Sequence, residues 1–201
     1  MMKTLINSNE VYTEQPFTSV DLSRQEIVEA EFAACWFKSC TLRETVFSGC
    51  HFDECIFEAC DLSMMKVQQS QFMDCKFTRC QLVGINWTEM ELSKSKLKAL
   101  FSFEGCVLNH STFIGISLKD LVMKDCTARN VDFSESGLQK ADLRGTDLAE
   151  SRFAQTDLSG ADLRGTKNYA IDPNLNTITG AHFVLPEALS LLYRLDIVLD
   201  E

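Results

Sequence analysis

A large apolar residue recurs every five positions along most of the chain. The series runs from Phe17 to Leu97 and, after one step of six residues, from Phe103 to Leu163. Among its thirty positions only Ala128 is a small residue. A period of five fits neither the 3.6-residue period of an α-helix nor the two-residue period of a simple strand. The pattern therefore indicates a structural unit of five residues that is repeated along the chain.

A second, longer period of twenty residues is superimposed on the period of five. The same large side chain returns after twenty residues, as in Phe17, Phe37, Phe57 and Phe77. Because twenty residues hold four units, we predict that four units make one coil and that equivalent residues stack on the next coil. Rings stacked at the spacing of β-strands stabilise each other beyond the area that they bury. The sequence thus predicts a solenoid with columns of phenylalanine in its core.

The units near the end of the series, ADLRG, TDLAE and TDLSG, resemble those of the pentapeptide-repeat family. That family's unit has a small residue, a polar residue, a central Leu or Phe and two polar residues. The resemblance covers residues 17–165 and implies an all-β fold, a right-handed quadrilateral β-helix. We expect residues 1–16 to form an N-terminal cap segment and residues 17–165 the β-helix, with a register step between Leu97 and Phe103. Residues 166–201 are expected to form a C-terminal cap and dimerisation tail.

Prolines avoid the series, as a β-helix requires. A proline cannot donate the backbone hydrogen bond that a strand between two neighbours needs. Pro16, Pro173 and Pro186 all lie outside the expected repeats.

All nine cysteines occupy the position two residues before a central residue. The other residues at this position are mostly Ala, Ser, Thr and Val, small side chains that point into a narrow interior. Zinc sites favour close pairs such as C-x₂-C, and stacked cysteines about 4.8 Å apart with parallel Cβ directions suit a disulfide poorly. We therefore predict buried packing and no metal for this set: Cys35, Cys40, Cys50, Cys55, Cys60, Cys75, Cys80, Cys106 and Cys126.

Nothing in this sequence indicates an enzyme site. A catalytic thiolate needs exposure and a neighbouring base, which a buried position does not offer. The chain has no Gly-rich phosphate loop, no G-x-S-x-G and no H-E-x-x-H. We expect a protein that is not an enzyme and binds no cofactor.

Charge and hydropathy restrict the partners. With 29 acidic against 19 basic residues the formal net charge is −10, which argues against direct binding of nucleic acid. The N-terminus lacks the apolar region of a secretory signal, and no apolar run approaches the roughly 18 residues of a membrane span. We expect a cytoplasmic protein without membrane contact, where structural disulfides are rare.

Two sets of acidic residues are candidates for binding a partner. In the first set, no Lys or Arg lies in the stretch from Asp53 to Asp61. In the second set, the repeats that contain the acids have no Lys or Arg. Acids near Arg144 and Arg164 differ, because Asp142 and Asp162 lie two residues from an arginine. Partner binding and plain solvation both remain open for the two sets: Asp53, Glu54, Glu58, Asp61 and Asp74; and Asp132, Glu135, Asp147, Glu150 and Asp157.

The last 36 residues leave the repeat and are strongly apolar. The open end of a solenoid must be capped or paired, and Pro186 suits the first turn of a short helix. A short strand is expected at residues 197–199. An exposed apolar patch usually marks an interface, and a symmetric dimer is the simplest form. The expected interface residues are Leu189, Leu191, Leu192, Leu195, Ile197 and Leu199.

The C-terminal tail resembles one group within the pentapeptide-repeat family. The segments IDPNLNTI and LPEALSLLYRLDIVL are similar to the C-terminal end of the Qnr quinolone-resistance proteins and of the immunity proteins against microcin B and albicidin. This resemblance implies that the tail joins two rods end to end, and that the acidic rod mimics duplex DNA. The implied partner is DNA gyrase or topoisomerase IV, protected from toxins or antibiotics. The alternative is a non-enzymatic scaffold that binds an unrelated protein, because a fold alone does not give a function.

One departure from that group concerns loops. Many Qnr proteins have loops that project from the coils and help protection. Here only the single extra residue between Leu97 and Phe103 interrupts residues 17–163, so we expect no projecting loop.

Overall fold

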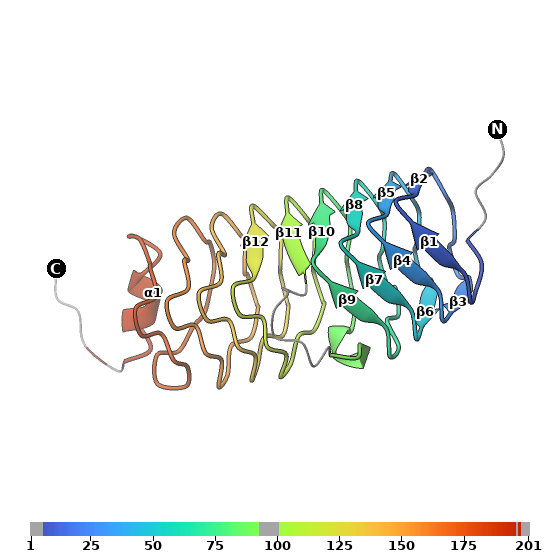
Figure 1. Cartoon of the computed structure of the whole chain (residues 1–201). Helices are drawn as coiled ribbons and strands as arrows, with labels where there is room; N and C mark the ends of the chain where they lie inside the picture. The colour runs from blue at the N-terminus through green and yellow to red at the C-terminus, as the bar shows by residue number, and fades with distance from the viewer. Residues whose placement is uncertain (1–5, 93–100, 196, 198–201) are drawn as a thin grey trace.

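The computed structural model describes residues 6–92, 101–195 and 197, and these form a rod of stacked coils. The two ends of the chain lie at opposite ends of the rod (Figure 1). The described strands are β1 (Val11–Thr13), β2 (Pro16–Thr18), β3 (Glu26–Val28), β4 (Glu31–Ala33), β5 (Trp36–Lys38), β6 (Val46–Ser48), β7 (His51–Asp53), β8 (Ile56–Glu58), β9 (Gln71–Met73), β10 (Cys75–Thr78), β11 (Phe101–Glu104) and β12 (Val122–Lys124). A 3₁₀ turn, η1 (Trp87–Glu89), and one helical turn, α1 (Leu189–Leu192), complete the elements.

The coils have four faces, and the described strands pair in parallel. The first face is the sheet β1-β4-β7-β9, and the second is the sheet β2-β5-β8-β10-β11-β12. The third consists of single bridges that run from Asp21 and Thr41 to Asp147 and Lys167, and the fourth begins with the pair β3-β6. This arrangement confirms the predicted all-β quadrilateral β-helix.

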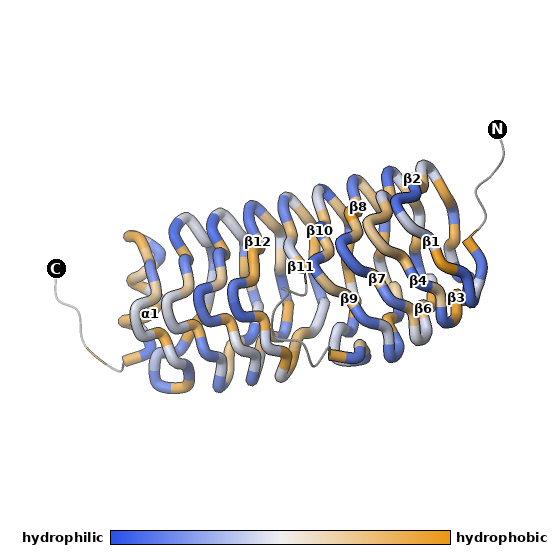
Figure 2. Tube along the Cα trace, in the orientation of Figure 1, coloured by the Kyte–Doolittle hydropathy of each residue, from blue (hydrophilic) through white to orange (hydrophobic). Residues whose placement is uncertain are grey.

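The central residues of the units fill the interior, as the five-residue period predicts. Phe37, Phe57 and Phe77 stack along the second face with ring centroids 4.6 and 4.8 Å apart. Phe32 and Phe52 stack in the same way on the first face, at 4.7 Å. Burial of a phenylalanine contributes about 1.5–3 kcal/mol, and a well-placed ring pair adds about 0.5–1.5 kcal/mol. Hydrophobic and hydrophilic residues consequently alternate around each coil (Figure 2).

Backbone hydrogen bonds join each coil to both neighbours in a fixed pattern. Around the central Leu42, the Thr41 N–H donates to Val20 in the preceding coil, whereas the Leu42 and Glu44 N–H groups donate to the following coil. The residue before the central position therefore donates backward. Pro16 holds this position in the first coil, where no preceding coil needs the bond. Pro16 thus lies inside β2, and the expectation that it precedes the repeats is wrong.

The position two residues before the centre supplies a second connection between coils. The Cys40 N–H donates to Cys60 Sγ at 3.3 Å, and the Cys60 thiol donates to the Phe37 carbonyl at 3.2 Å. Serine acts in the same way, because the Cys50 N–H donates to Ser70 Oγ at 3.0 Å. A buried N–H without a partner costs about 1–3 kcal/mol, so these side chains stabilise the stack as well as filling it. The sequence had indicated only their small size.

The predicted burial of the nine cysteines is confirmed, and all nine are free thiols. Burial raises the pKa of the Cys50 and Cys75 thiols above the ordinary range of cysteine. Within the described part of the chain no three His, Cys, Asp or Glu side chains are grouped to hold a metal ion.

The coils extend past both expected limits of the repeat. Before Phe17, Tyr12 is buried and stacks on Phe32 at 5.2 Å, and β1 pairs with β4. Beyond residue 165, His182 still pairs with Asp162. Residues 10–16 and 166–182 therefore contribute to the stack, although their sequences depart from the repeat.

The register changes once, and by more than expected. Gln81 pairs with Val107, which is 26 residues later, whereas Val107 pairs with Thr127 after the usual 20. Six extra residues therefore lie in this coil, so the expectation of a single extra residue is wrong. The segment for which no projecting loop was expected lies mostly outside the described residues. Leu92, expected to be central, is 47% exposed, and Leu97 lies outside the described residues. Leu92 therefore fits the spacing of the repeat without being a buried central residue.

Burial of the thiols predicts slow labelling of the native protein. A bulky thiol reagent should modify few cysteines before unfolding and nine after denaturation without reductant. Measuring the thiols by mass spectrometry tests this. Fast labelling of the folded protein would show that the thiols are not enclosed.

Replacement of Cys60 tests the bridging bonds. Cys60→Ser should retain the bonds to Cys40 and Phe37, as Ser70 does at its own position, whereas Cys60→Ala leaves the Cys40 N–H without a partner. We expect Cys60→Ala to lose about 1–3 kcal/mol of unfolding free energy and Cys60→Ser clearly less. Denaturant unfolding of the two variants gives the comparison, and an alanine variant as stable as the serine variant would contradict the bridging role.

Candidate functional site

The first predicted set of acids is divided among three faces. Asp53 belongs to β7, and Glu54 and Asp74 follow β7 and β9 at the corner of the first face. Glu58 belongs to β8 on the second face, and Asp61 lies on the third. The structure therefore brings together only three of the five predicted residues.

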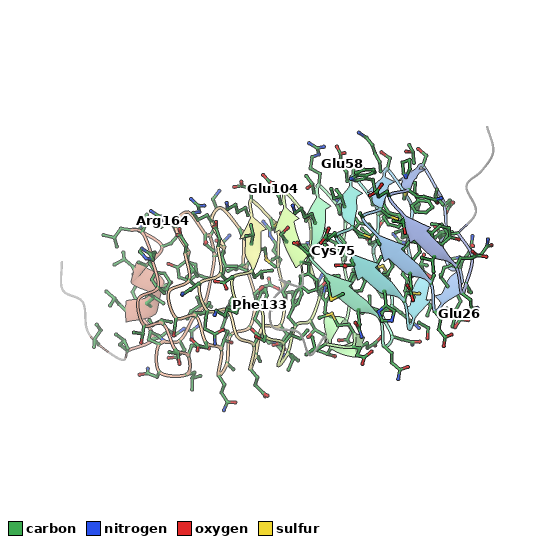
Figure 3. The ribbon with its side chains drawn as sticks, viewed as in Figure 1. Glu26, Glu58, Cys75, Glu104, Phe133 and Arg164 are labelled. Atoms are coloured by element: carbon green, nitrogen blue, oxygen red, sulfur yellow. The ribbon has the colours of Figure 1, made fainter. Side chains whose placement is uncertain are left out.

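The two separated acids have partners of their own. Glu58 projects from the outside of β8 (Figure 3), where Lys38 Nζ lies 3.4 Å from its carboxylate and Arg79 forms a second ion pair with it. Asp61 accepts a hydrogen bond from the Ser63 N–H at 3.0 Å. The stretch around Glu58 contains no Lys or Arg, but Lys38 and Arg79 lie one coil away and balance its charge.

The second predicted set is also largely paired. Arg129 lies 2.6 Å from Asp147, and Arg152 lies 4.0 Å from Asp132, in each case from a neighbouring coil. These two acids, whose own repeats contain no Lys or Arg, therefore have basic partners one coil away.

The other members of the second set differ from one another. Asp157 accepts hydrogen bonds from Gln139 and Ser159, and those from Ser159 lower its pKa below the usual range. Glu135 and Glu150 are exposed at corners on the fourth and third faces. This set consequently forms no single surface.

The arginine partners expected from the sequence are present. Arg144 lies 2.7 Å from Asp142, and Arg164 lies 2.6 Å from Asp162. Hydrogen bonds from Arg144, assisted by Lys124, lower the pKa of Asp142 to about 2. These acids lie on the second face, where their charge is balanced.

The first face gathers acids that are far apart in sequence. Its strands and corners, residues 10–14, 31–34, 51–54 and 71–74, contain no Lys or Arg, and His51 is their one potentially basic residue. Further glutamates line its edge with the fourth face. We call this surface the acidic face, and its acids are Glu10, Glu14, Glu29, Glu31, Asp53, Glu54, Asp74, Glu89 and Glu91.

An open groove follows the edge of the acidic face. It has a volume of about 770 Å³, and its lining includes Glu29, Glu31, His51, Glu89 and Glu91. Gln71 donates a hydrogen bond to Glu91 at 2.9 Å, which holds that carboxylate beside β9. The groove is therefore lined mainly by polar atoms and carries negative charge.

Six of the seven glutamates of the acidic face, all except Glu54, were not predicted, because they come from repeats that are far apart in the chain. The relevant signal is the column of residues at one register position in successive coils. Reading every twentieth residue from Glu14 gives Ala34, Glu54 and Asp74, and reading from Glu31 gives His51. Such columns contain no lysine or arginine along the first four coils.

The C-terminal end carries an exposed apolar surface beside the predicted helix. Leu191 is partly buried and packs against the core, so it caps the last coil. Leu192 is also partly buried, and Leu199 lies outside the described residues. We call the exposed set the C-terminal patch; it consists of Leu175, Val184, Leu185, Leu189, Tyr193, Leu195 and Ile197.

The patch includes three of the predicted interface residues. Leu189, Leu195 and Ile197 are all more than one-third exposed, and Leu185 and Tyr193 are 74% and 73% exposed. The strand expected at residues 197–199 falls mostly outside the described residues.

Pro186 lies in the turn before α1, and Pro173 lies in an earlier turn. In the described part of the chain, no helix has the length and apolar character needed to cross a bilayer.

Comparison with solved structures identifies the same architecture elsewhere. One trypsin-treated variant of QnrB1, a plasmid-mediated fluoroquinolone resistance protein, is 17% identical with a TM-score of 0.61, over 94% of this chain and 97% of that chain. A second trypsin-treated variant of QnrB1 is 17% identical with a TM-score of 0.55, over 98% of this chain and 100% of that chain. At this identity the likeness shows a shared fold.

Comparison of sequences gives the family. No curated protein matches the chain. The family model described as "Pentapeptide repeat region" matches residues 30–100 and 101–169, which together make up most of the sequence. The chain therefore belongs to the pentapeptide-repeat family.

Proposed function

We propose that this protein binds DNA gyrase or topoisomerase IV through its acidic face and protects that enzyme from toxins or antibiotics. The observation that carries the proposal is the concentration of nine acids on the acidic face: six in its strands and corners, which contain no Lys or Arg, and three along its edge. The fold that the chain shares with QnrB1, a fluoroquinolone resistance protein, supports the choice of partner.

The spacing of the acids suits a surface that resembles DNA. Coils stack about 4.8 Å apart, and the acidic face offers roughly two carboxylates per coil. Duplex DNA carries one negative charge per about 1.7 Å of its axis, or about 3.4 Å for each strand. The linear charge density of the acidic face lies between these values. A basic channel that focuses anions would therefore attract it as it attracts DNA.

The adjoining second face does not provide comparable negative charge. On the second face Glu58 is balanced by Lys38 and Arg79, and Asp142 by Lys124 and Arg144. Only a net field steers a partner at long range, so the acidic face is the surface that determines the association rate.

The C-terminal patch is proposed to join two copies of the chain. Large exposed apolar areas are rare on monomers, and a self-complementary contact at the end of a rod gives a symmetric dimer. Because the patch lies at the end opposite the N-terminus (Figure 1), two rods joined there would extend the charged surface in both directions.

Charge reversal tests the acidic face. The triple variant Glu31→Lys, Glu54→Lys, Asp74→Lys should associate with gyrase at least tenfold more slowly at low salt. It should also lose most of the salt dependence of association, because screening acts on the steering field over about 10 Å at 0.1 M salt. Lysine suits the left-handed corners, since Lys140 adopts φ 58° at an equivalent position. Stopped-flow association and competition with duplex DNA give the readout.

A matched triple variant provides the control. Glu104→Lys, Asp125→Lys, Glu150→Lys changes the net charge equally but lies on the second and third faces. It should retain most of the association rate and of the protection of DNA supercoiling against a gyrase poison. Equal loss in both variants would contradict a specific acidic face. If the unaltered protein forms no complex with either topoisomerase at low salt, the partner is an unrelated protein.

Polar substitution tests the C-terminal patch. The double variant Tyr193→Glu, Leu195→Glu should sediment as a monomer at micromolar concentration, because two charges would be buried against the second copy. Val11→Glu is the control, since Val11 is also 65% exposed but lies on β1 at the other end of the rod. Analytical ultracentrifugation measures both, and an unaltered protein that sediments as a monomer would contradict the dimer.

A further inference from the structure

An exposed tryptophan lies on the outside of the second face. Trp36 is 48% exposed on β5, although its neighbour Phe37 is fully buried. The parallel register places Pro16 of β2 on one side of it and Ile56 of β8 on the other. We call Pro16, Trp36 and Ile56 the apolar strip.

The fold does not require this strip. The core at β5 is filled by Phe37, and Trp36 points away from it. Beyond β8, the strand β10 carries an exposed lysine, Lys76, at the position that pairs with Ile56. A polar side chain therefore suits the same place in the register. An indole that leaves half of its surface in water forfeits much of the stabilisation that burial provides. Tryptophan is, however, among the residues that most often dominate the energy of a protein interface.

The apolar strip borders the acidic face. Ala34 forms the corner two residues before Trp36, with a left-handed φ of 50°. Glu14 and Glu54 hold the same corner position in the preceding and following coils, with φ values of 52° and 55°. The small Ala34 therefore lies in the same coil as Trp36, and the acidic Glu14 and Glu54 lie in the coils before and after it.

The opposite border of the strip carries no excess negative charge, because two cations share one carboxylate there. Lys38 on β5 pairs with Glu58 at 3.4 Å, and Arg79 pairs with the same carboxylate. The excess negative charge beside Trp36 consequently comes from the acidic face. A cationic partner is the chemistry that this asymmetry favours.

We propose that the apolar strip anchors a cationic protein surface whose arginine or lysine stacks on Trp36 beside Glu14 and Glu54. A guanidinium group packs well on an indole face and pairs with carboxylates at the same time. The inference rests on the proposed function. It adds to the charged surface an exposed apolar contact, which duplex DNA lacks. The acidic face determines how fast the topoisomerase associates, and the apolar strip determines how long the complex lasts.

Separate measurement of the two rate constants tests this anchor. The full-length protein and its Trp36→Ala and Trp36→Phe variants are bound to purified DNA gyrase over a range of salt concentrations. Trp36→Ala should dissociate at least tenfold faster, with the association rate and its salt dependence unchanged. Trp36→Phe retains an aromatic face and should lie between. The control Ile114→Ala removes an apolar side chain that is 42% exposed on the fourth face, and it should behave as the unaltered protein.

The outcomes separate the anchor from the proposed function. If the unaltered protein binds gyrase and Trp36→Ala dissociates at the same rate, the anchor is overturned while the acidic face stands. A Trp36→Ala variant with altered salt dependence, or with a β-sheet spectrum unlike the unaltered protein, would show a disturbed fold and also overturn it. Equal acceleration by Ile114→Ala would exclude a specific strip. Absence of any complex with the unaltered protein contradicts both proposals.

Discussion

The parallel hydrogen-bond ladder between successive coils is the interaction on which the rest of the structure depends. Each unit donates backward from the residue before its centre and forward from the centre, as Thr41 and Leu42 do. The side chain two residues before the centre adds a bridge, as in Cys60. These bonds form only if equivalent residues of neighbouring coils are level. The central side chains then stack, and the small position is enclosed.

The ladder also determines which surface residues are neighbours. Residues about twenty apart lie side by side, so the charge of a position depends on its column. Glu58 has Lys38 and Arg79 beside it and contributes no excess charge, whereas Glu54, four residues earlier, belongs to a column without Lys or Arg in the first four coils. The same rule places Trp36 at the border of the acidic face. Charge and apolar contact are thereby combined on adjoining faces of one rod.

The sequence predicted the fold and the enclosed cysteines because both follow from periods of five and twenty residues. It failed where the period alone is misleading. Leu92 fits the spacing but lies outside the core, since backbone pairing and not hydrophobic spacing decides where a coil resumes. Tyr12 was missed because the first coil has no preceding repeat to define its register. The acids were assigned from neighbours in the chain, while their electrostatic partners lie one coil away.

A structure of the complex with DNA gyrase, determined by electron cryo-microscopy, tests the central claim most directly. We predict that β1, β4, β7 and β9 face the basic DNA-binding groove of the enzyme, with Trp36 in contact at the border of that surface. A complex in which gyrase contacts the third or fourth face, and leaves the acidic face in solvent, would contradict it.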